Sequence, residues 1–131
     1  MPAWRDIWAA RRLDGGAGST LARLLAADGF DTGFGTMPEA AWRDYVMRCA
    51  ARLDLRPGDS LFEVGCGAGA LLYPLAEHGC RVGGIDYSAA LIAAARAALP
   101  DGDWRCAEAG APLPAADFVV ASGVFLYFPS L

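Results

Sequence analysis

Residues 62 to 71, FEVGCGAGAL, place glycines at positions 65, 67 and 69, directly after an apolar run. Glycine has no Cβ, so it adopts positive φ and lets other atoms approach the backbone. A glycine turn that opens a helix also presents free backbone N–H groups to a ligand. The stretch therefore predicts a strand, a ligand-binding turn and a helix in that order.

The sequence from residue 58 onward alternates short apolar strands with helical segments. Such alternation implies right-handed crossovers and a mostly parallel sheet, so we expect an α/β fold with helices on both faces of the sheet. The expected strands are 60–64, 81–85, 103–107 and 117–122, and the expected helices are about 70–78 and 88–99.

The sequence before residue 58 has a helical pattern instead. Ser19 is a good N-cap and Gly29 a good helix stop, and three helices are expected at 2–13, 19–29 and 37–55. We therefore divide the chain into an N-terminal helical cap segment, 1–57, and a sheet segment, 58–131.

Length and composition limit the class of protein. A chain of 131 residues with 55% apolar and 20% charged residues is expected to fold as one domain. No apolar run approaches the roughly 20 residues of a membrane span, and the N-terminus lacks a signal-peptide pattern, which predicts a cytoplasmic protein without a membrane partner. The four cysteines are scattered and there is one histidine, so no metal site is expected.

The net charge of −4 is unevenly distributed. Residues 1–57 hold eight arginines and seven acidic residues, about +1, whereas residues 58–131 hold three arginines and eight acidic residues, about −5. A negative field around the glycine turn opposes nucleic acid and favours a cationic or zwitterionic ligand.

Two acidic residues flank the glycine turn and separate two possible ligands. The letters GCGAGA satisfy the loose dinucleotide fingerprint, and Asp86 lies at a suitable distance to bind a ribose. Glu63, two residues before the first glycine, would repel a pyrophosphate but could bind an ammonium group. A nicotinamide-dependent oxidoreductase therefore stays open, but the acid favours a cationic ligand.

Residues 61–96, LFEVGCGAGALLYPLAEHGCRVGGIDYSAALIAAAR, resemble the first half of the class I S-adenosylmethionine-dependent methyltransferases. LPAADFVVASGVFLYF, residues 113–128, is similar to the fourth-strand region of that family. The resemblance implies a Rossmann-like sheet in the order 3-2-1-4 and in-line transfer of a methyl group from S-adenosylmethionine, leaving S-adenosylhomocysteine. We expect a small-molecule acceptor.

The resemblance also implies roles for individual residues. The glycine turn would carry the methionine portion of the cofactor, Asp86 the ribose hydroxyls and Tyr87 the adenine, with Glu108 near the adenine amine. The implied cofactor-binding residues are Glu63, Gly65, Cys66, Gly67, Gly69, Asp86, Tyr87, Glu108, Ala109, Ser122 and Gly123. A lid or acceptor pocket could be formed by Trp42, Tyr45, Phe125 and Tyr127.

Several of these residues also have purely structural interpretations. Glu63 could pair with an arginine of residues 1–57, Asp86 could cap the helix that begins near Ser88, and Trp42 could be a core residue. No side chain is assigned as a catalytic base.

The family's sheet has further strands beyond the fourth, whereas these 131 residues end just after it. An apolar fourth strand without a second neighbour invites pairing with another chain. We therefore expect a fragment of a longer protein, or an assembly that pairs through residues 117–128 or is poorly soluble. A truncated or non-catalytic module that binds cofactor or a partner is the alternative function.

Overall fold

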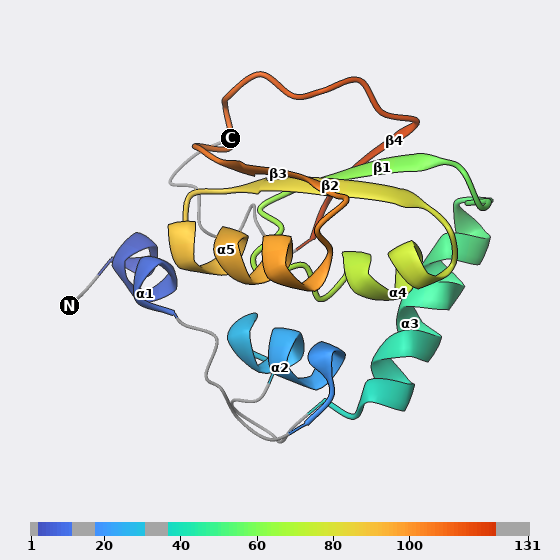
Figure 1. The fold of residues 1–131 in the computed structure, drawn as a ribbon, viewed down its shortest axis with the longest axis horizontal. Coiled ribbons are helices and arrows are strands. Elements are labelled where there is room, and N and C mark those ends of the chain that lie inside the picture. The colour runs from blue at the N-terminus through green and yellow to red at the C-terminus, as the bar shows by residue number, and fades with distance from the viewer. Residues whose placement is uncertain (1–2, 12–17, 31–36, 123–131) are drawn as a thin grey trace.

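The computed structural model describes residues 3–11, 18–30 and 37–122, and its centre is a parallel sheet of four strands (Figure 1). The strands are β1 (Ser60–Val64), β2 (Arg81–Asp86), β3 (Asp103–Cys106) and β4 (Phe118–Ala121). Their spatial order is β3-β2-β1-β4, with Phe62 opposite Gly83 on one side and Val119 on the other. The sequence prediction of a parallel sheet in the order 3-2-1-4 is confirmed.

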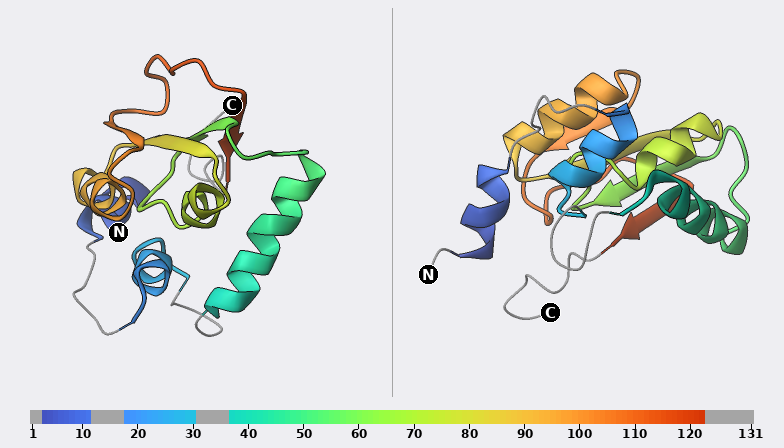
Figure 2. Two further views of the ribbon diagram at one scale, coloured as in Figure 1. Left: turned by 45° about the vertical axis from the view of Figure 1, so that its right-hand side comes forward. Right: turned by 90° about the horizontal axis from the view of Figure 1, so that it is seen from below.

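The helices are arranged in layers below this sheet. Figure 2 shows α4 (Leu72–Glu77) and α5 (Ala89–Ala98) directly against it, with α2 (Thr20–Ala27) beneath them. α3 (Glu39–Arg52) runs beside α4, and α1 (Trp4–Ala10) lies near the edge at which β2 and β3 end. None of the described helices has the length and apolar character needed to span a membrane.

Helix ends follow the capping residues in the sequence. The Ser19 hydroxyl accepts the N–H of Ala22 at 3.1 Å, and Gly29, just after α2, has φ of 89°. The Ser88 hydroxyl accepts the N–H of Leu91 at 3.4 Å and caps α5. The expected start and stop of α2 and the start of α5 are therefore confirmed, while α1 is shorter than the predicted 2–13.

Side chains of each strand lie alternately on the two faces of the sheet, because successive residues of a strand point to opposite sides. Leu61 belongs to the core shared with the helices, so Glu63 lies on that same side of β1 and is only 4% exposed. Phe62 lies on the opposite face, where the Arg105 guanidinium is 5.8 Å from its ring centre. A carboxylate is thus buried on the helical side, next to the glycine turn.

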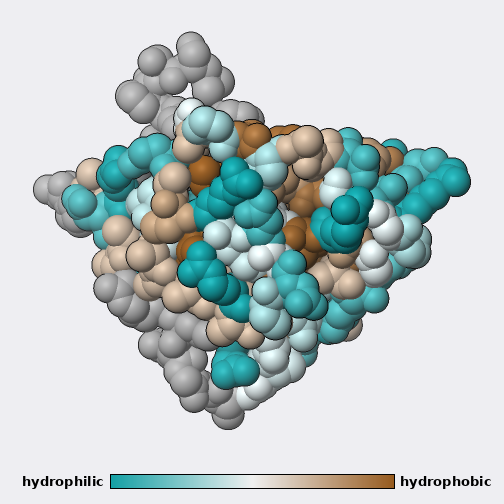
Figure 3. Space-filling view, turned by 45° about the horizontal axis from the view of Figure 1, so that its top comes forward, coloured by the Kyte–Doolittle hydropathy of each residue, from teal (hydrophilic) through white to brown (hydrophobic). Residues whose placement is uncertain are grey.

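The expectation of helices on both faces is not met in the described part of the chain. Residues 107–117 connect β3 to β4 without a helix and cross the face opposite α4 and α5 (Figure 1). This connection is short and contains Pro112 and Pro114, which lack the N–H that a helix needs. Seen from this side, apolar side chains are visible between charged ones (Figure 3).

One apolar core joins the N-terminal helices to the sheet. Leu21 and Leu24 of α2 belong to the same cluster as Leu72 of α4 and Leu91 of α5. The indole of Trp42 on α3 donates a hydrogen bond to the Ala70 carbonyl at 2.8 Å, at the end of the glycine turn. The predicted boundary at residue 57 therefore marks a change of secondary structure within a continuous core.

Close packing of β2 against the glycine turn gives a first prediction. A Cβ at Gly84 would lie 2.5 Å from Cβ and 2.6 Å from Sγ of Cys66, so Gly84→Ala should lower the free energy of unfolding by about 1 to 3 kcal/mol. A Cβ at Gly110 would have no atom within 4 Å, so Gly110→Ala serves as the control. Urea unfolding measures both, and equal stabilities would contradict this packing.

Candidate functional site

The glycine turn between β1 and α4 has a conformation that other residues rarely adopt. Gly65, Gly67 and Gly69 have φ of 72°, 56° and 88°. The N–H groups of Gly65 and Cys66 donate to the Ile85 carbonyl at 2.8 and 3.1 Å, which ties the turn to the end of β2. The predicted strand-turn-helix unit is confirmed, and its shape requires the glycines.

Two of these glycines face different surroundings. A Cβ at Gly69 would make ordinary contacts with the Trp104 ring at 3.4 Å and Ala95 at 3.6 Å, so the positive φ, and not lack of space, requires glycine there. A Cβ at Gly67 would overlap Oδ1 of Asp28. The close approach that Gly67 permits is therefore made by a carboxylate of the same chain.

Asp28, at the C-terminal end of α2, is a site residue that the sequence analysis did not identify. Its Oδ1 accepts the N–H of Ala68 at 2.6 Å, and its Oδ2 accepts the N–H of Ala70 at 3.0 Å. An acid at a helix C-terminus opposes the helix dipole. That unfavourable position was the one signal in the sequence that Asp28 has a role outside its own helix.

Glu63 lies on the same side of the sheet and lacks a partner for one oxygen. The residue is 4% exposed, and its Oε2 has no hydrogen-bond partner within residues 3–11, 18–30 and 37–122. A buried carboxylate without a partner is costly unless a cation or donor compensates it. A cation or a hydrogen-bond donor beside Glu63 would therefore offset this cost.

Asp86, at the end of β2, holds the turn from the other side. Its Oδ2 accepts the N–H of Gly67 at 3.0 Å, and its Oδ1 accepts the N–H of Ser88 at 2.9 Å. The cap of α5 is Ser88, and Asp86 bonds the N–H of that cap residue without capping the helix itself. An ionised carboxylate has about four acceptor positions, so capacity remains for the hydroxyl groups of a ligand.

Burial raises the pKa of all three carboxyl groups, and neighbouring acids add to this effect for Asp28 and Glu63. Burial, and secondarily the charge of Asp86, raises the pKa of Asp28 to about 7, against the lowering effects of the Ala68 and Ala70 N–H groups and of Arg11. Burial, then repulsion from Asp28 and Asp86, raises the pKa of Glu63 well above its usual range. Burial also raises the pKa of Asp86. Simultaneous ionisation of Asp28, Glu63 and Asp86 is therefore unfavourable in the protein without a ligand.

Other predicted cofactor residues lie around the same edge of the sheet. Arg5 of α1 forms an ion pair with Glu108 and stands 5.3 Å from the ring centre of Tyr87, so α1 approaches both residues. Ala109 and Ser122 follow the ends of β3 and β4. Burial raises the pKa of the Cys66 thiol, which makes it a poor nucleophile and fits a small loop residue.

Two of the four aromatic residues proposed for a lid or acceptor pocket, Trp42 and Tyr45, lie in the described structure, and their rings are neighbours on α3. Trp42 is 5% exposed and belongs to the core, whereas Tyr45 is 45% exposed with its ring 5.5 Å from that of Trp42. Trp42 thus supports the glycine turn from beneath through its bond to Ala70. Gly123, Phe125 and Tyr127 lie outside the described residues.

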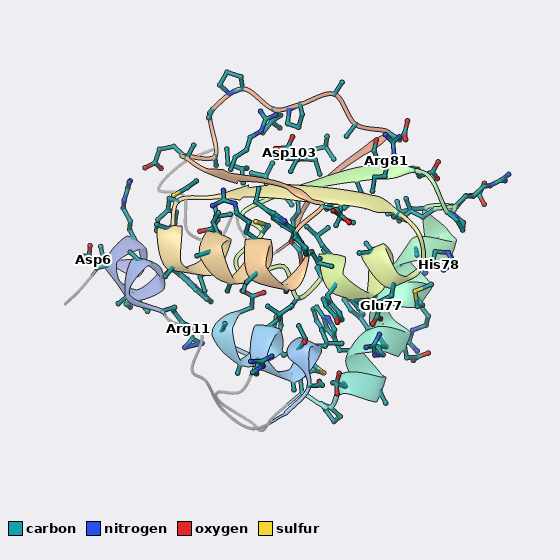
Figure 4. All side chains as sticks on the ribbon, in the orientation of Figure 1. Asp6, Arg11, Glu77, His78, Arg81 and Asp103 are labelled. Atoms are coloured by element: carbon teal, nitrogen blue, oxygen red, sulfur yellow. The ribbon has the colours of Figure 1, made fainter. Side chains whose placement is uncertain are left out.

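A cavity of about 610 Å³ lies away from these carboxylates. Its lining includes Glu77, Arg81 and Asp103, at the edge where the strands begin. Figure 4 places Glu77, His78 and Arg81 at the end of the molecule opposite Asp6 and Arg11 of the N-terminal segment. The glycine turn, and not this cavity, is therefore the candidate site.

Comparison with known proteins agrees with this geometry. A family model described as "Methyltransferase domain" matches residues 62–131, which is more than half of the chain and includes the glycine turn. The chain belongs to this methyltransferase family. The resemblance inferred from the sequence is therefore confirmed, together with the Rossmann-like fold class.

Individual relatives of this methyltransferase domain differ in the molecules they are named for. The chain is 44% identical over 55 residues to 23S rRNA (uracil(1939)-C(5))-methyltransferase RlmD of Ralstonia nicotianae, covering 42% of this chain and 12% of that protein. It is 36% identical over 83 residues to trans-aconitate 2-methyltransferase of an Azoarcus species, covering 60% and 33%. The chain thus spans a third or less of these relatives' lengths.

A solved structure supports the fold over almost the whole chain. Magnesium protoporphyrin IX methyltransferase from Synechocystis PCC 6803, crystallised with S-adenosylmethionine, matches with a TM-score of 0.64 and 21% identity. The match covers 95% of this chain and 62% of that one. The N-terminal helices are thus included in the likeness.

The raised pKa of Asp28 predicts how stability depends on pH. Between about pH 4 and pH 7 folded Asp28 keeps a proton that the unfolded chain has lost, so its contribution to stability is full at low pH and is lost as pH rises through about 7. The free energy of unfolding should fall more in the wild type than in Asp28→Asn between pH 5 and pH 8, by about 2 kcal/mol.

Urea unfolding at the two pH values measures this difference. Asp44→Asn makes the same chemical change at an exposed residue of α3 that pairs with Arg48, and it should behave as the wild type does. Identical pH dependence in the wild type and Asp28→Asn would show that the pKa of Asp28 is not raised in the folded protein.

Proposed function

We propose that this chain is the cofactor-binding part of an S-adenosylmethionine-dependent methyltransferase. The observation that carries the proposal is the glycine turn lined by Asp28, Glu63 and Asp86, in which Glu63 Oε2 has no partner in the described structure. S-adenosylmethionine has an ammonium and a sulfonium group, and both are cations. Negative side chains at the turn suit such a ligand and disfavour an anionic one.

The described residues fit the cofactor at three points. Glu63 would bind the ammonium group, since its free oxygen is buried and lacks a donor. Asp86 would accept the ribose hydroxyls while keeping its bonds to the Gly67 and Ser88 N–H groups. Tyr87 and Glu108 would border the adenine at the carboxyl edge of the sheet, next to α1.

S-adenosylmethionine, when bound, supplies an activated methyl group, whose transfer by in-line displacement releases a neutral thioether. The chain's residues would contribute orientation and the exclusion of water, which account for much of the barrier reduction in reactions of this kind. The carboxylates would lie near the positive charge that disappears on transfer. No residue of the described structure is assigned as a general base.

A dinucleotide is a poorer fit for a specific reason. In dinucleotide-binding folds the pyrophosphate accepts N–H groups at the start of the first helix. Here the N–H groups of Ala68 and Ala70 already donate to the Asp28 carboxylate. A pyrophosphate would have to displace one carboxylate and lie beside two others, so a nicotinamide-dependent oxidoreductase is disfavoured.

We propose a small molecule as the methyl acceptor. The two relatives named above act on an rRNA and on trans-aconitate, so relatedness leaves both acceptor classes open. The support comes from charge, because the net charge of −4 opposes the approach of a polyanion.

Incubating the chain with radiolabelled S-adenosylmethionine and cell extract, with and without ribonuclease, tests whether the acceptor is a small molecule. If the extract is treated with ribonuclease before the reaction and low-mass products are still labelled, a small-molecule acceptor is supported. Label found only in RNA contradicts a small-molecule acceptor.

Asp86→Asn tests the cofactor assignment. The variant loses charge-assisted bonds to the ribose, so S-adenosylmethionine should bind about 2 kcal/mol more weakly by isothermal titration calorimetry. The control is Asp101→Asn, an exposed residue at the opposite edge of the sheet. Unchanged affinity in Asp86→Asn would remove Asp86 from the site, and binding of NAD in place of S-adenosylmethionine would overturn the proposed function.

We further propose that β4 pairs with a second copy of this chain when the 131 residues are studied alone. In the described sheet β4 has β1 on one side only, and Val119 on its helix-free face is 53% exposed. An open apolar strand edge favours pairing with another strand. Light scattering should give a mass of at least twice 13.7 kDa, and a monodisperse monomer would contradict this proposal.

A further inference from the structure

Asp28 connects the N-terminal helices to the cofactor turn through the backbone of that turn. Its two carboxylate oxygens accept the N–H groups of Ala68 and Ala70, which lie on either side of Gly69. Both bonds are short enough to fix the orientation of the peptide groups that they involve. The shape of the turn therefore depends on a side chain that lies about 40 residues earlier, outside the part matched by the family model.

Charged groups face Asp28 from three other elements. Glu63 of β1 and Asp86 at the end of β2 are acidic, and Arg11, just after α1, is the positive group that acts on Asp28. Cys66 of the turn also interacts with these carboxylates, but burial keeps its thiol protonated. Full ionisation of three acids against one arginine would leave an excess of negative charge in a desolvated place.

The unpartnered Oε2 atom of Glu63 indicates which kind of ligand group would offset the negative charge of the ionised acids. It is buried without a partner in the described structure, on the same side of the sheet as Asp28. The described residues contain no group of three or more acidic, histidine or cysteine side chains that could hold a metal ion. An ammonium group, which has three N–H donors and one charge, fits the unsatisfied oxygen.

We infer that Asp28 is a positioning residue of the cofactor site, and that Asp28 and Glu63 together release a proton when the ammonium group of the cofactor binds. This inference rests on the proposed function. The carboxyl O–H bond breaks, its proton passes to the buffer base, and no bond of the cofactor forms or breaks. Asp28 in its ionised form then holds the Ala68 and Ala70 N–H groups while Glu63 faces the ammonium.

The consequence is that cofactor affinity increases with pH. In the protein without ligand, burial and mutual repulsion raise the pKa values of both acids, that of Asp28 to about 7. A nearby cation favours the ionised forms, so the complex binds fewer protons than the protein without ligand does. Affinity should therefore rise as pH increases toward about 7 and level off once the acids are ionised without ligand.

Calorimetry on the complete 131-residue chain with S-adenosylhomocysteine measures both effects. Titrations at pH 7 in PIPES and in Tris, whose ionisation heats differ, give the number of protons released per ligand bound. Below pH 7 the affinity should fall by up to about tenfold per pH unit for each proton released. A second series at pH 5.5, 6.5, 7.5 and 8.5 gives this slope directly.

Two variants separate Asp28 from the other titrating groups. Asp28→Asn keeps the size of the side chain but has no ionisable group and one acceptor in place of two. It should release fewer protons, have a shallower pH dependence, and bind the ligand at least severalfold more weakly at pH 8. Asp44→Asn, on the exposed face of α3, should match the wild type in all three quantities.

Each outcome has a separate meaning. Binding by the wild type with no proton release and no pH dependence overturns this inference and leaves the proposed function standing. Equal proton release in the wild type and Asp28→Asn also overturns the role of Asp28. If neither S-adenosylhomocysteine nor S-adenosylmethionine binds at any pH, while circular dichroism shows a folded chain, the proposed function fails and this inference fails with it. If Asp28→Asn does not fold, the wild-type titrations still decide whether binding of the ligand releases a proton.

Discussion

The backbone of the glycine turn depends on two carboxylates that hold it from opposite sides. Asp86 accepts the Gly67 N–H from the end of β2, and Asp28 accepts the Ala68 and Ala70 N–H groups from the end of α2. Buried backbone N–H groups need partners, and these acids satisfy three of those in the turn before α4. The turn, the sheet and the N-terminal helices are therefore joined at one small polar centre inside an apolar core.

This arrangement explains why a cationic cofactor and a stable turn are compatible. The acids that shape the turn also concentrate negative charge where burial makes it unfavourable, as the raised pKa values of Asp28 and Glu63 indicate. A bound cation would offset that charge, so ligand binding would stabilise the same centre that positions the ligand. The N-terminal helices then belong to the site through Asp28 and Trp42, as well as covering it.

The caps at Ser19 and Ser88 and the glycine turn could be predicted because each follows from local residue patterns, whereas the sheet order was implied by the family resemblance. The sequence also placed Glu63 and Asp86 beside the turn, where the structure has them. Asp28 could not be found in this way, because its partners lie about 40 residues further along the chain and only tertiary packing brings them together. In the described part of the chain the face opposite α4 and α5 has no helix, because residues 107–117, which include two prolines, connect β3 to β4 without one. Trp42 is a core residue, and its indole donates a hydrogen bond to the Ala70 carbonyl.

The central claim is that the carboxylates at the glycine turn bind the ammonium group at the amino-acid end of the cofactor. Comparing S-adenosylhomocysteine with 5′-deoxy-5′-methylthioadenosine, which keeps the nucleoside and the thioether but lacks the ammonium and carboxylate groups, tests this claim directly. Titration calorimetry at pH 8 should show that loss of the amino-acid end weakens binding by at least about 2 kcal/mol, or about 30-fold. Equal affinities for the two ligands would contradict the claim and would leave the buried Glu63 carboxylate without a ligand.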